Sequence, residues 1–305
     1  GALSVSELMQ ETLARIELVN PKVNALVNIL SKEACEKLAS AECPLEGALG
    51  GMPMAIKDLA NVKGFKTTEG SPLYSERVAR KDDQMVARLR AAGALFIGKT
   101  NTPEFGLGSN TFNPVYGKTK NPYDLTRTCG GSSGGAAVAL ATRMLSISDG
   151  SDMMGSLRNP AAWNNVYGLR PTWGLVPPEP SGEIFLSQLS TLGPMARSPK
   201  DLALLLDVQA NHFDNKSYVA QSKSFSNFTA QPRMKNIKIG WLGDWGGTLT
   251  FEDELLDLAQ NALNEMSSLG ATIHDLKAPF AMNDIWTSWC DLRAWQITNG
   301  LRDIY

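Results

Sequence analysis

The chain is poor in histidine, which limits the ways in which it could activate a serine. Of its 305 residues only two are histidines, His212 and His274, and neither lies near a serine-rich turn. The local sequence therefore does not favour a hydrolase whose serine nucleophile is activated by a histidine base.

Cysteine is also scarce, and no long hydrophobic run is present. The cysteines show neither the spacing of metal ligands nor the density of a disulfide scaffold, so we expect reduced thiols in a cytoplasmic protein. The first seven residues lack the basic start and the apolar stretch of a signal peptide. No apolar run reaches the ~18–20 residues of a membrane-spanning helix. The four cysteines are Cys35, Cys43, Cys129 and Cys290.

No excess of one charge is present either. The formal net charge is −2 and the pI is about 5.8, so neither nucleic acid nor an anionic membrane is an expected partner. Hydrophobic residues make up 43% of the chain and charged residues 20%, which is typical of a globular protein with a sizeable core.

Helical and strand-like segments alternate along the chain, without an internal repeat or a low-complexity linker. This alternation predicts an α/β protein whose sheet is covered by helices. Ser4-Val-Ser-Glu7 is a capping box that starts a helix ending near Asn20-Pro21. The expected helices are then 82–92, 136–145 and 251–269, the strands are 54–56, 94–97, 237–241 and 271–274, and 217–233 is a long surface loop.

One lysine and two serine-bearing glycine turns carry the candidate chemistry. They are Lys57 at the end of a short apolar segment, the run Gly130-Gly-Ser-Ser-Gly-Gly135, and Gly155-Ser156. A serine hydroxyl needs a base to take its proton, and a lysine can be that base when burial keeps it neutral. The glycines allow close backbone approach, so their amides can hold an oxyanion. Such a relay needs neither a metal nor an organic cofactor.

The same residues have ordinary interpretations, which stay open on local grounds. The Gly130–Gly135 run has the composition of a linker, although an apolar helix follows it at once. Lys57 could be an exposed lysine at a strand end, because buried lysines are rare. Ser156 could be a helix N-cap before Leu157-Arg158.

Two other motifs compete for the functional assignment. Gly93 to Thr100 fits the phosphate-loop pattern, but its middle four residues look like a buried strand rather than a loop. Gly130 to Gly134 fits the nucleophile elbow of an α/β-hydrolase esterase, but that elbow follows a strand, whereas residues 121–128 are polar and turn-like. That esterase would also need His212 or His274.

Three blocks of sequence together resemble the amidase signature family. They are Gly51-Met-Pro-Met-Ala-Ile-Lys57-Asp58, the run from Gly130 to Gly135, and Asp149-Gly-Ser-Asp-Met-Met-Gly-Ser-Leu-Arg-Asn-Pro-Ala161. Gly98-Lys-Thr-Asn-Thr-Pro-Glu104 and Gly168-Leu-Arg-Pro-Thr172 are similar to the family as well. Lys57 precedes Ser132 by 75 residues and Ser132 precedes Ser156 by 24. This spacing is similar to the pattern of the family, and that similarity selects Ser132 over Ser133.

The resemblance implies an amidase with a large mixed β-sheet core covered by helices on both faces. The chain would be one domain over residues 1–305, truncated at the C-terminus and slightly at the N-terminus. Ser156 would be the nucleophile, Ser132 the bridging serine after a cis Gly131–Ser132 peptide, and Lys57 the general base. Backbone amides of Met153, Met154, Gly155 and Ser156 would form the oxyanion hole. Gly131, Ser133, Asp152 and Arg158 would support these loops.

The resemblance also implies a small-molecule amide as substrate and leaves the oligomeric state open, with a homodimer as one option. This chain has Met153-Met154 where the family usually has Thr-Gly. A methionine at position 154 would be strained if that position required a positive φ. Its side chain is expected to pack in the core.

The second block is similar to a branch of the family that acts on secondary and aryl amides. A glutaminase subunit of a tRNA-dependent amidotransferase shares the signature. The Met153-Met154 pair, in place of the usual Thr-Gly, argues against that assignment. A binding protein with an idle triad is the remaining alternative.

Overall fold

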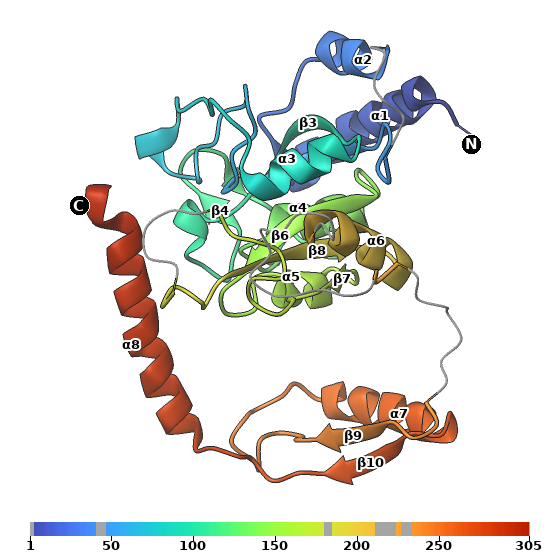
Figure 1. Ribbon diagram of the computed structural model, residues 1–305, viewed down its shortest axis with the longest axis vertical. Coiled ribbons are helices and arrows are strands. Elements are labelled where there is room, and N and C mark those ends of the chain that lie inside the picture. The colour runs from blue at the N-terminus through green and yellow to red at the C-terminus, as the bar shows by residue number, and fades with distance from the viewer. Residues whose placement is uncertain (1–2, 41–46, 180–184, 211–223, 227–233, 305) are drawn as a thin grey trace. The chain divides into compact units, whose positions relative to one another are not determined.

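The computed structural model describes residues 3–40, 47–179, 185–210, 224–226 and 234–304 (Figure 1). The chain divides into two compact units, Gly1–Phe228 and Thr229–Tyr305, so the prediction of one domain over 1–305 stays a prediction. The expected surface loop at 217–233 lies outside the described residues apart from Ser224–Ser226. None of the described helices combines the length and the apolarity needed to cross a membrane.

The first unit is a mixed α/β structure, as the sequence predicts. One three-stranded sheet has the order β1-β3-β2, in which β2 runs parallel to β3 and β1 antiparallel to it. A second, antiparallel sheet has the order β6-β8-β7. A short hairpin, β4-β5, lies outside both sheets. The bounds are β1 Leu26–Val27, β2 Pro53–Lys57, β3 Leu95–Thr100, β4 Phe112–Asn113, β5 Gly117–Lys118, β6 Ile147–Asp152, β7 Tyr167–Gly168 and β8 Thr191–Ala196.

The two three-stranded sheets adjoin along β2 and β6. At this seam the Lys57 backbone N–H donates to the side chain of Asp149 at 3.0 Å, instead of to a backbone carbonyl of β6. The strands of both sheets therefore form one mixed core that places the end of β2 beside β6.

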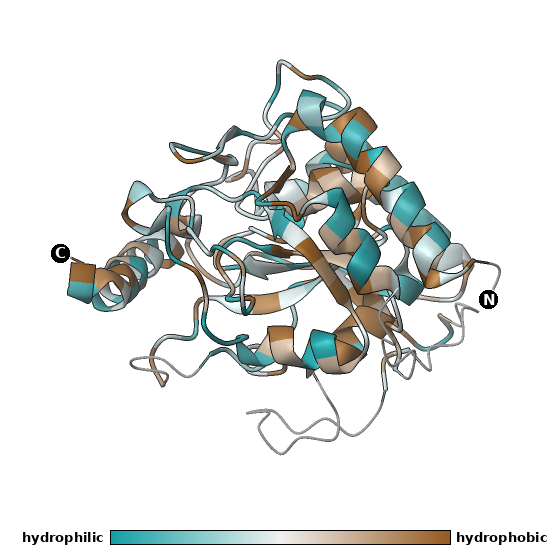
Figure 2. Cartoon of the chain, turned by 90° about the horizontal axis from the view of Figure 1, so that it is seen from above, coloured by the Kyte–Doolittle hydropathy of each residue, from teal (hydrophilic) through white to brown (hydrophobic). Residues whose placement is uncertain are grey.

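Helices cover both faces of this core. On one face lie α1 (Val5–Val23), α2 (Lys32–Ser40) and α4 (Gly134–Ala141), and on the other lie α3 (Gln84–Ala91) and α6 (Pro199–Ala210). The strands serve both layers because side chains alternate: Ala55 joins the first hydrophobic cluster, whereas Met54 and Ile56 join the second. Apart from α4, which is apolar throughout, the helices mix hydrophobic and hydrophilic residues, as covering helices do (Figure 2).

Local sequence signals explain where these helices begin and end. The Ser4–Glu7 capping box starts α1, as predicted. That helix runs to Val23, past the expected end, because Pro21 falls in its last turn and the left-handed residue Asn24 caps it. α4 is shorter than expected: it begins at Gly134 and ends at Ala141, and Arg143 has a positive φ of 61°.

Other short elements complete the first unit. α5 spans Arg158–Trp163, and two short 3-10 helices, η1 and η2, span Pro72–Tyr74 and Glu104–Gly106.

The second unit is a small βαβ structure followed by a long helix. Its strands β9 (Lys238–Trp241) and β10 (Thr272–Asp275) pair in parallel, and α7 (Leu255–Ser268) connects them. These elements confirm the predicted strand–helix–strand order. α8 (Met282–Leu301) and η3 (Arg302–Ile304) follow them.

Candidate active site

Lys57 is a buried lysine, not an exposed one. It is the last residue of β2, and only 2% of its surface is accessible. Its Nζ lies 2.7 Å from Ser132 Oγ, 2.9 Å from Ser133 Oγ and 3.0 Å from Ser151 Oγ. A neutral amine has two N–H donors and one lone pair, so in that state one of these hydroxyls can donate its proton to Nζ.

Burial lowers the pKa of Lys57 to about 7, because taking an ammonium out of water disfavours its charged form. The negative charges of Asp149 and Asp152 act in the opposite direction and raise the pKa. The balance leaves a lysine that exchanges its proton near neutral pH.

The first glycine turn brings two serines to Lys57. Gly130 has a φ of 77°, and the Gly131–Ser132 peptide is cis, as the family resemblance implies. A side chain at Gly131 would meet the Thr111 hydroxyl and the Asn110 backbone at 3.0–3.2 Å. The Ser133 N–H donates to the carbonyl of Ser156 at 3.1 Å, which ties the first turn to the second.

Asp152 organises the second turn. Its carboxylate accepts from the backbone N–H of Gly155 at 2.7 Å and of Leu157 at 3.2 Å, and from Arg158 Nε at 3.0 Å. These hydrogen bonds, above all those with Arg158, hold the pKa of Asp152 well below its usual range although its burial opposes them. Asp152 is therefore hydrogen-bonded to the backbone of the second turn and to Arg158.

A sequence model of the family described as Amidase matches residues 7–291. The chain belongs to the amidase family. It is 36% identical over 284 residues to a glutamyl-tRNA(Gln) amidotransferase subunit of Syntrophobacter fumaroxidans. It is 37% identical over 289 residues to the protein of the same name from Carboxydothermus hydrogenoformans. Each comparison covers 91% of this chain and 58% of the relative, so the chain spans just over half the length of these relatives.

Solved structures of amidase signature enzymes share this fold. A bacterial aryl acylamidase of that family superposes with a TM-score of 0.89 at 29% identity, covering 99% of this chain and 64% of the other. The 6-aminohexanoate cyclic dimer hydrolase complexed with substrate gives a TM-score of 0.81 at 30% identity, covering 90% of this chain and 58% of the other. The mixed α/β architecture predicted from the sequence is therefore confirmed.

Ser156, the nucleophile expected of an amidase, lies half-buried in the second turn. Within the part of the chain that the structure describes, its hydroxyl makes no hydrogen bond to Ser132. The hydrogen-bonded link between Lys57 and Ser132 is thus in place, whereas the second link of the expected relay is not made in this conformation. The catalytic roles of the three residues stay predictions at this point.

Met154 of the second turn does not pack as expected. Met154 is 53% exposed, so the prediction that it packs in the core is wrong. The positive φ falls on Gly155, at 106°, and Met154 is not among the described residues with positive φ, so it carries no such strain. The Gly155 amide donates to Asp152. The amides of Met153, Met154 and Ser156 have no hydrogen-bond partner among the described residues, so their N–H groups are free to donate.

The structure adds charged and polar residues that the sequence analysis did not single out. Ser151 and Asp149 lie two residues apart on β6 and both contact Lys57, Ser151 through Nζ and Asp149 through the backbone N–H. Residues two apart share one face of a strand, but the sequence analysis predicted no strand at β6 and so could not use this spacing. Asp58 and Lys99 form a second buried pair, with 3.8 Å between the carboxylate and Nζ.

The competing motifs do not form the sites they would require. Residues 95–100 are strand β3, and Lys99 Nζ donates to the carbonyl of Ala60, so no phosphate loop forms there. Residues 121–128 contain no strand, only an isolated bridge at Thr128, which removes the context of a nucleophile elbow. His274 is an exposed residue of the second unit, and His212 lies outside the described residues.

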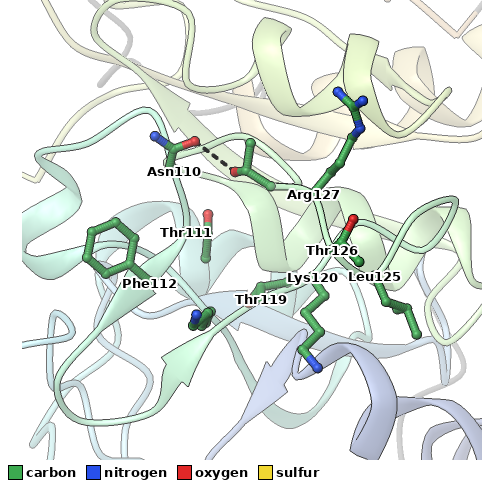
Figure 3. Close-up of a pocket in the computed structure, with 10 residues that line it drawn as sticks. Asn110, Thr111, Phe112, Thr119, Lys120, Leu125, Thr126 and Arg127 are labelled. Atoms are coloured by element: carbon green, nitrogen blue, oxygen red, sulfur yellow. Dashed lines mark hydrogen bonds between the residues drawn. The ribbon is translucent and has the colours of Figure 1, made fainter.

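A cavity of about 310 Å³ is lined by residues of the segments 110–112, 118–120 and 125–128 (Figure 3). Its wall includes Thr111, whose hydroxyl donates to the Gly130 carbonyl at 2.8 Å, and the Thr128 hydroxyl, which donates to Asn110 Oδ1 at 2.8 Å. Lys57, Ser132 and Ser156 are not among its lining residues. The cavity is therefore separate from the candidate catalytic residues.

Proposed function

We propose that this protein hydrolyses the C–N bond of a small-molecule carboxylic amide through an acyl-serine intermediate. Ser156 Oγ attacks the carbonyl carbon, and its proton passes through Ser132 to the neutral amine of Lys57. The backbone amides of the second turn hold the negative oxygen of the tetrahedral intermediate. The C–N bond then breaks as the proton returns from Lys57 through Ser132 to the departing nitrogen.

Water completes the reaction. It attacks the acyl-Ser156 ester, gives one proton through the same relay, and Ser156 leaves as a hydroxyl with the carboxylic acid as product. No cofactor or metal enters any step. We place the enzyme in the cytoplasm, as the sequence predicts.

One observation carries this proposal: the buried Nζ of Lys57 lies 2.7 Å from Ser132 Oγ and is surrounded by hydroxyls alone. Within the described residues no carboxylate pairs with Nζ in an ion pair, so nothing neutralises its charge directly. A structural lysine would be expected to have such a partner, whereas a catalytic base must be able to lose its proton.

Fluorophosphonate labelling tests the nucleophile. We expect one adduct, on Ser156, mapped by mass spectrometry on the full-length protein, and we expect no adduct in a Ser156→Ala variant. The labelling rate should fall about tenfold per pH unit below pH 7, because only the neutral Lys57 accepts a proton. An adduct on Ser132 or Ser133, or undiminished labelling at pH 5, would contradict the assignment.

A glutaminase subunit of an amidotransferase is the second candidate, and the names of the curated relatives favour it. The likeness to a bacterial aryl acylamidase favours a hydrolase of aryl amides instead. Turnover of glutamine and of a panel of anilides separates the two. We expect the anilides to be hydrolysed by the protein alone; glutamine hydrolysis that appears only when a partner protein is added would support the amidotransferase.

A further inference from the structure

Asp149 is a fully buried carboxylate that the proposed mechanism does not use. It lies in the middle of β6, and 1% of its surface is accessible. A buried aspartate is costly unless its charge is compensated or its oxygens are hydrogen-bonded. Its role therefore needs an explanation from its neighbours.

The principal contact of this carboxylate is with the catalytic lysine itself. Asp149 Oδ1 accepts the backbone N–H of Lys57 at 3.0 Å, across the seam between the two sheets. On β6 the side chain two residues further, Ser151, accepts from Lys57 Nζ at 3.0 Å. One strand thus holds Lys57 at both ends, by its backbone through Asp149 and by its amine through Ser151.

The charges around this seam come from several parts of the chain. Asp58 directly follows β2, Lys99 lies on β3, and Asp152 at the end of β6 pairs with Arg158 and Arg170. Arg77 and Asp83 act on Lys99 from further away. α4 and β8, which also pack here, have no ionisable side chain. Of the charges that act on Lys57, that of Asp149 has the largest effect. Burial raises the pKa of Asp149 itself, against the Lys57 N–H and the charges of Lys99 and Lys57, which lower it.

The geometry points to Asp149 as a positioning residue for the proposed reaction: its carboxylate holds the Lys57 backbone at the end of β2 against β6, and so fixes where the Lys57 amine lies. This inference rests on the proposed function for its catalytic meaning. The direction of the expected change in the pKa of Lys57 follows from the negative charge of Asp149. A negative neighbour favours the ammonium form, so removing the charge lowers the pKa of Lys57 below about 7.

Asp149→Asn tests the inference, because asparagine keeps an oxygen that accepts the Lys57 N–H but has no charge. We expect the titration midpoint of Lys57 to move down by about one pH unit. The midpoint is read by carbon-13 NMR of Cε-labelled lysine, with the Lys57 signal identified by its loss in Lys57→Met. The pH below which fluorophosphonate labelling slows should move down by the same amount.

Two further variants keep the test decisive. Ser148→Ala, a buried neighbour on β6 outside the site, should leave both midpoints unchanged. Asp149→Ser also removes the charge and replaces the asparagine variant if that variant does not fold. An unchanged or raised midpoint in the folded variant overturns the inference. A wild-type Lys57 that titrates near pH 7 without any labelling of Ser156 would instead overturn the proposed function and leave the NMR test of Asp149 valid.

Discussion

Lys57→Met should lower the turnover of an amide substrate by a factor of about 10²–10⁴, the usual contribution of a positioned acid–base group. Methionine nearly fills the volume of the buried side chain, so the loss reports the missing amine and not a cavity. The loss should be smaller for an ester with the same acyl group. An alkoxide leaves without help far more readily than an amine, which must be protonated as it departs.

Steady-state turnover of a matched amide and ester pair measures this difference. Lys63→Met is a suitable control, because Lys63 is an exposed lysine near β2 and should retain wild-type rates. Circular dichroism of both variants establishes that they are folded. Equal losses on the amide and the ester would argue that Lys57 does not protonate the leaving group.

Asp152→Ala should destabilise the first unit by about 3 kcal/mol and abolish detectable labelling of Ser156. The carboxylate is 0% exposed and accepts the amides of Gly155 and Leu157, which would be left without their partner. Breaking a buried charged network typically costs about 3–5 kcal/mol. We expect a loss at the lower end of this range, because Arg158 is 55% exposed and water can replace its contact with Asp152. Without these hydrogen bonds the turn no longer fixes Ser156.

Urea denaturation of the wild type and the variant measures the loss of stability. Because the pKa of Asp152 is lowered in the folded protein, its stabilisation is fully present above the ordinary value of 3.8 and is lost as the pH falls below it. The difference in unfolding free energy between the wild type and Asp152→Ala should therefore become smaller at acidic pH. Arg158→Ala is the matched comparison. It should lower the unfolding free energy by less than Asp152→Ala, because the hydrogen bonds from the Gly155 and Leu157 amides to Asp152 remain. An Asp152→Ala variant of wild-type stability would show that the turn holds its shape without the carboxylate.

Much of the local structure could be predicted because short sequence signals specify it. The capping box from Ser4 to Glu7 starts α1, and Gly93 follows α3 as its stop. The apolar segment before Lys57 correctly placed that residue at the end of a strand. Helix bounds were harder to predict: α4 spans Gly134–Ala141, whereas the sequence indicated 136–145. A side chain at Gly134 would clash with Thr111 and one at Gly135 with the backbone of Asn101, contacts that exist only in the folded protein.

The candidate site could be predicted only as a set of residues. The resemblance to the amidase signature family selected Lys57, Ser132 and Ser156, and the family match covers all three. The exposure of Met154 and the occupied amide of Gly155 could not be foreseen, since both depend on how the turn folds around Asp152. The same holds for Asp149 and Ser151, whose contacts reach Lys57 across more than 90 residues of sequence.

The order of residues was enough to specify the turns, the alternation of helices and strands, and the identity of the groups that can exchange a proton. The burial of Lys57 and the lowering of its pKa to about 7 became visible only in the folded protein. The physical reason is that desolvation and charge are properties of the surroundings. For Lys57 those surroundings come from β6 and from the glycine turn before α4, segments that are distant in the chain and meet only when the sheets adjoin.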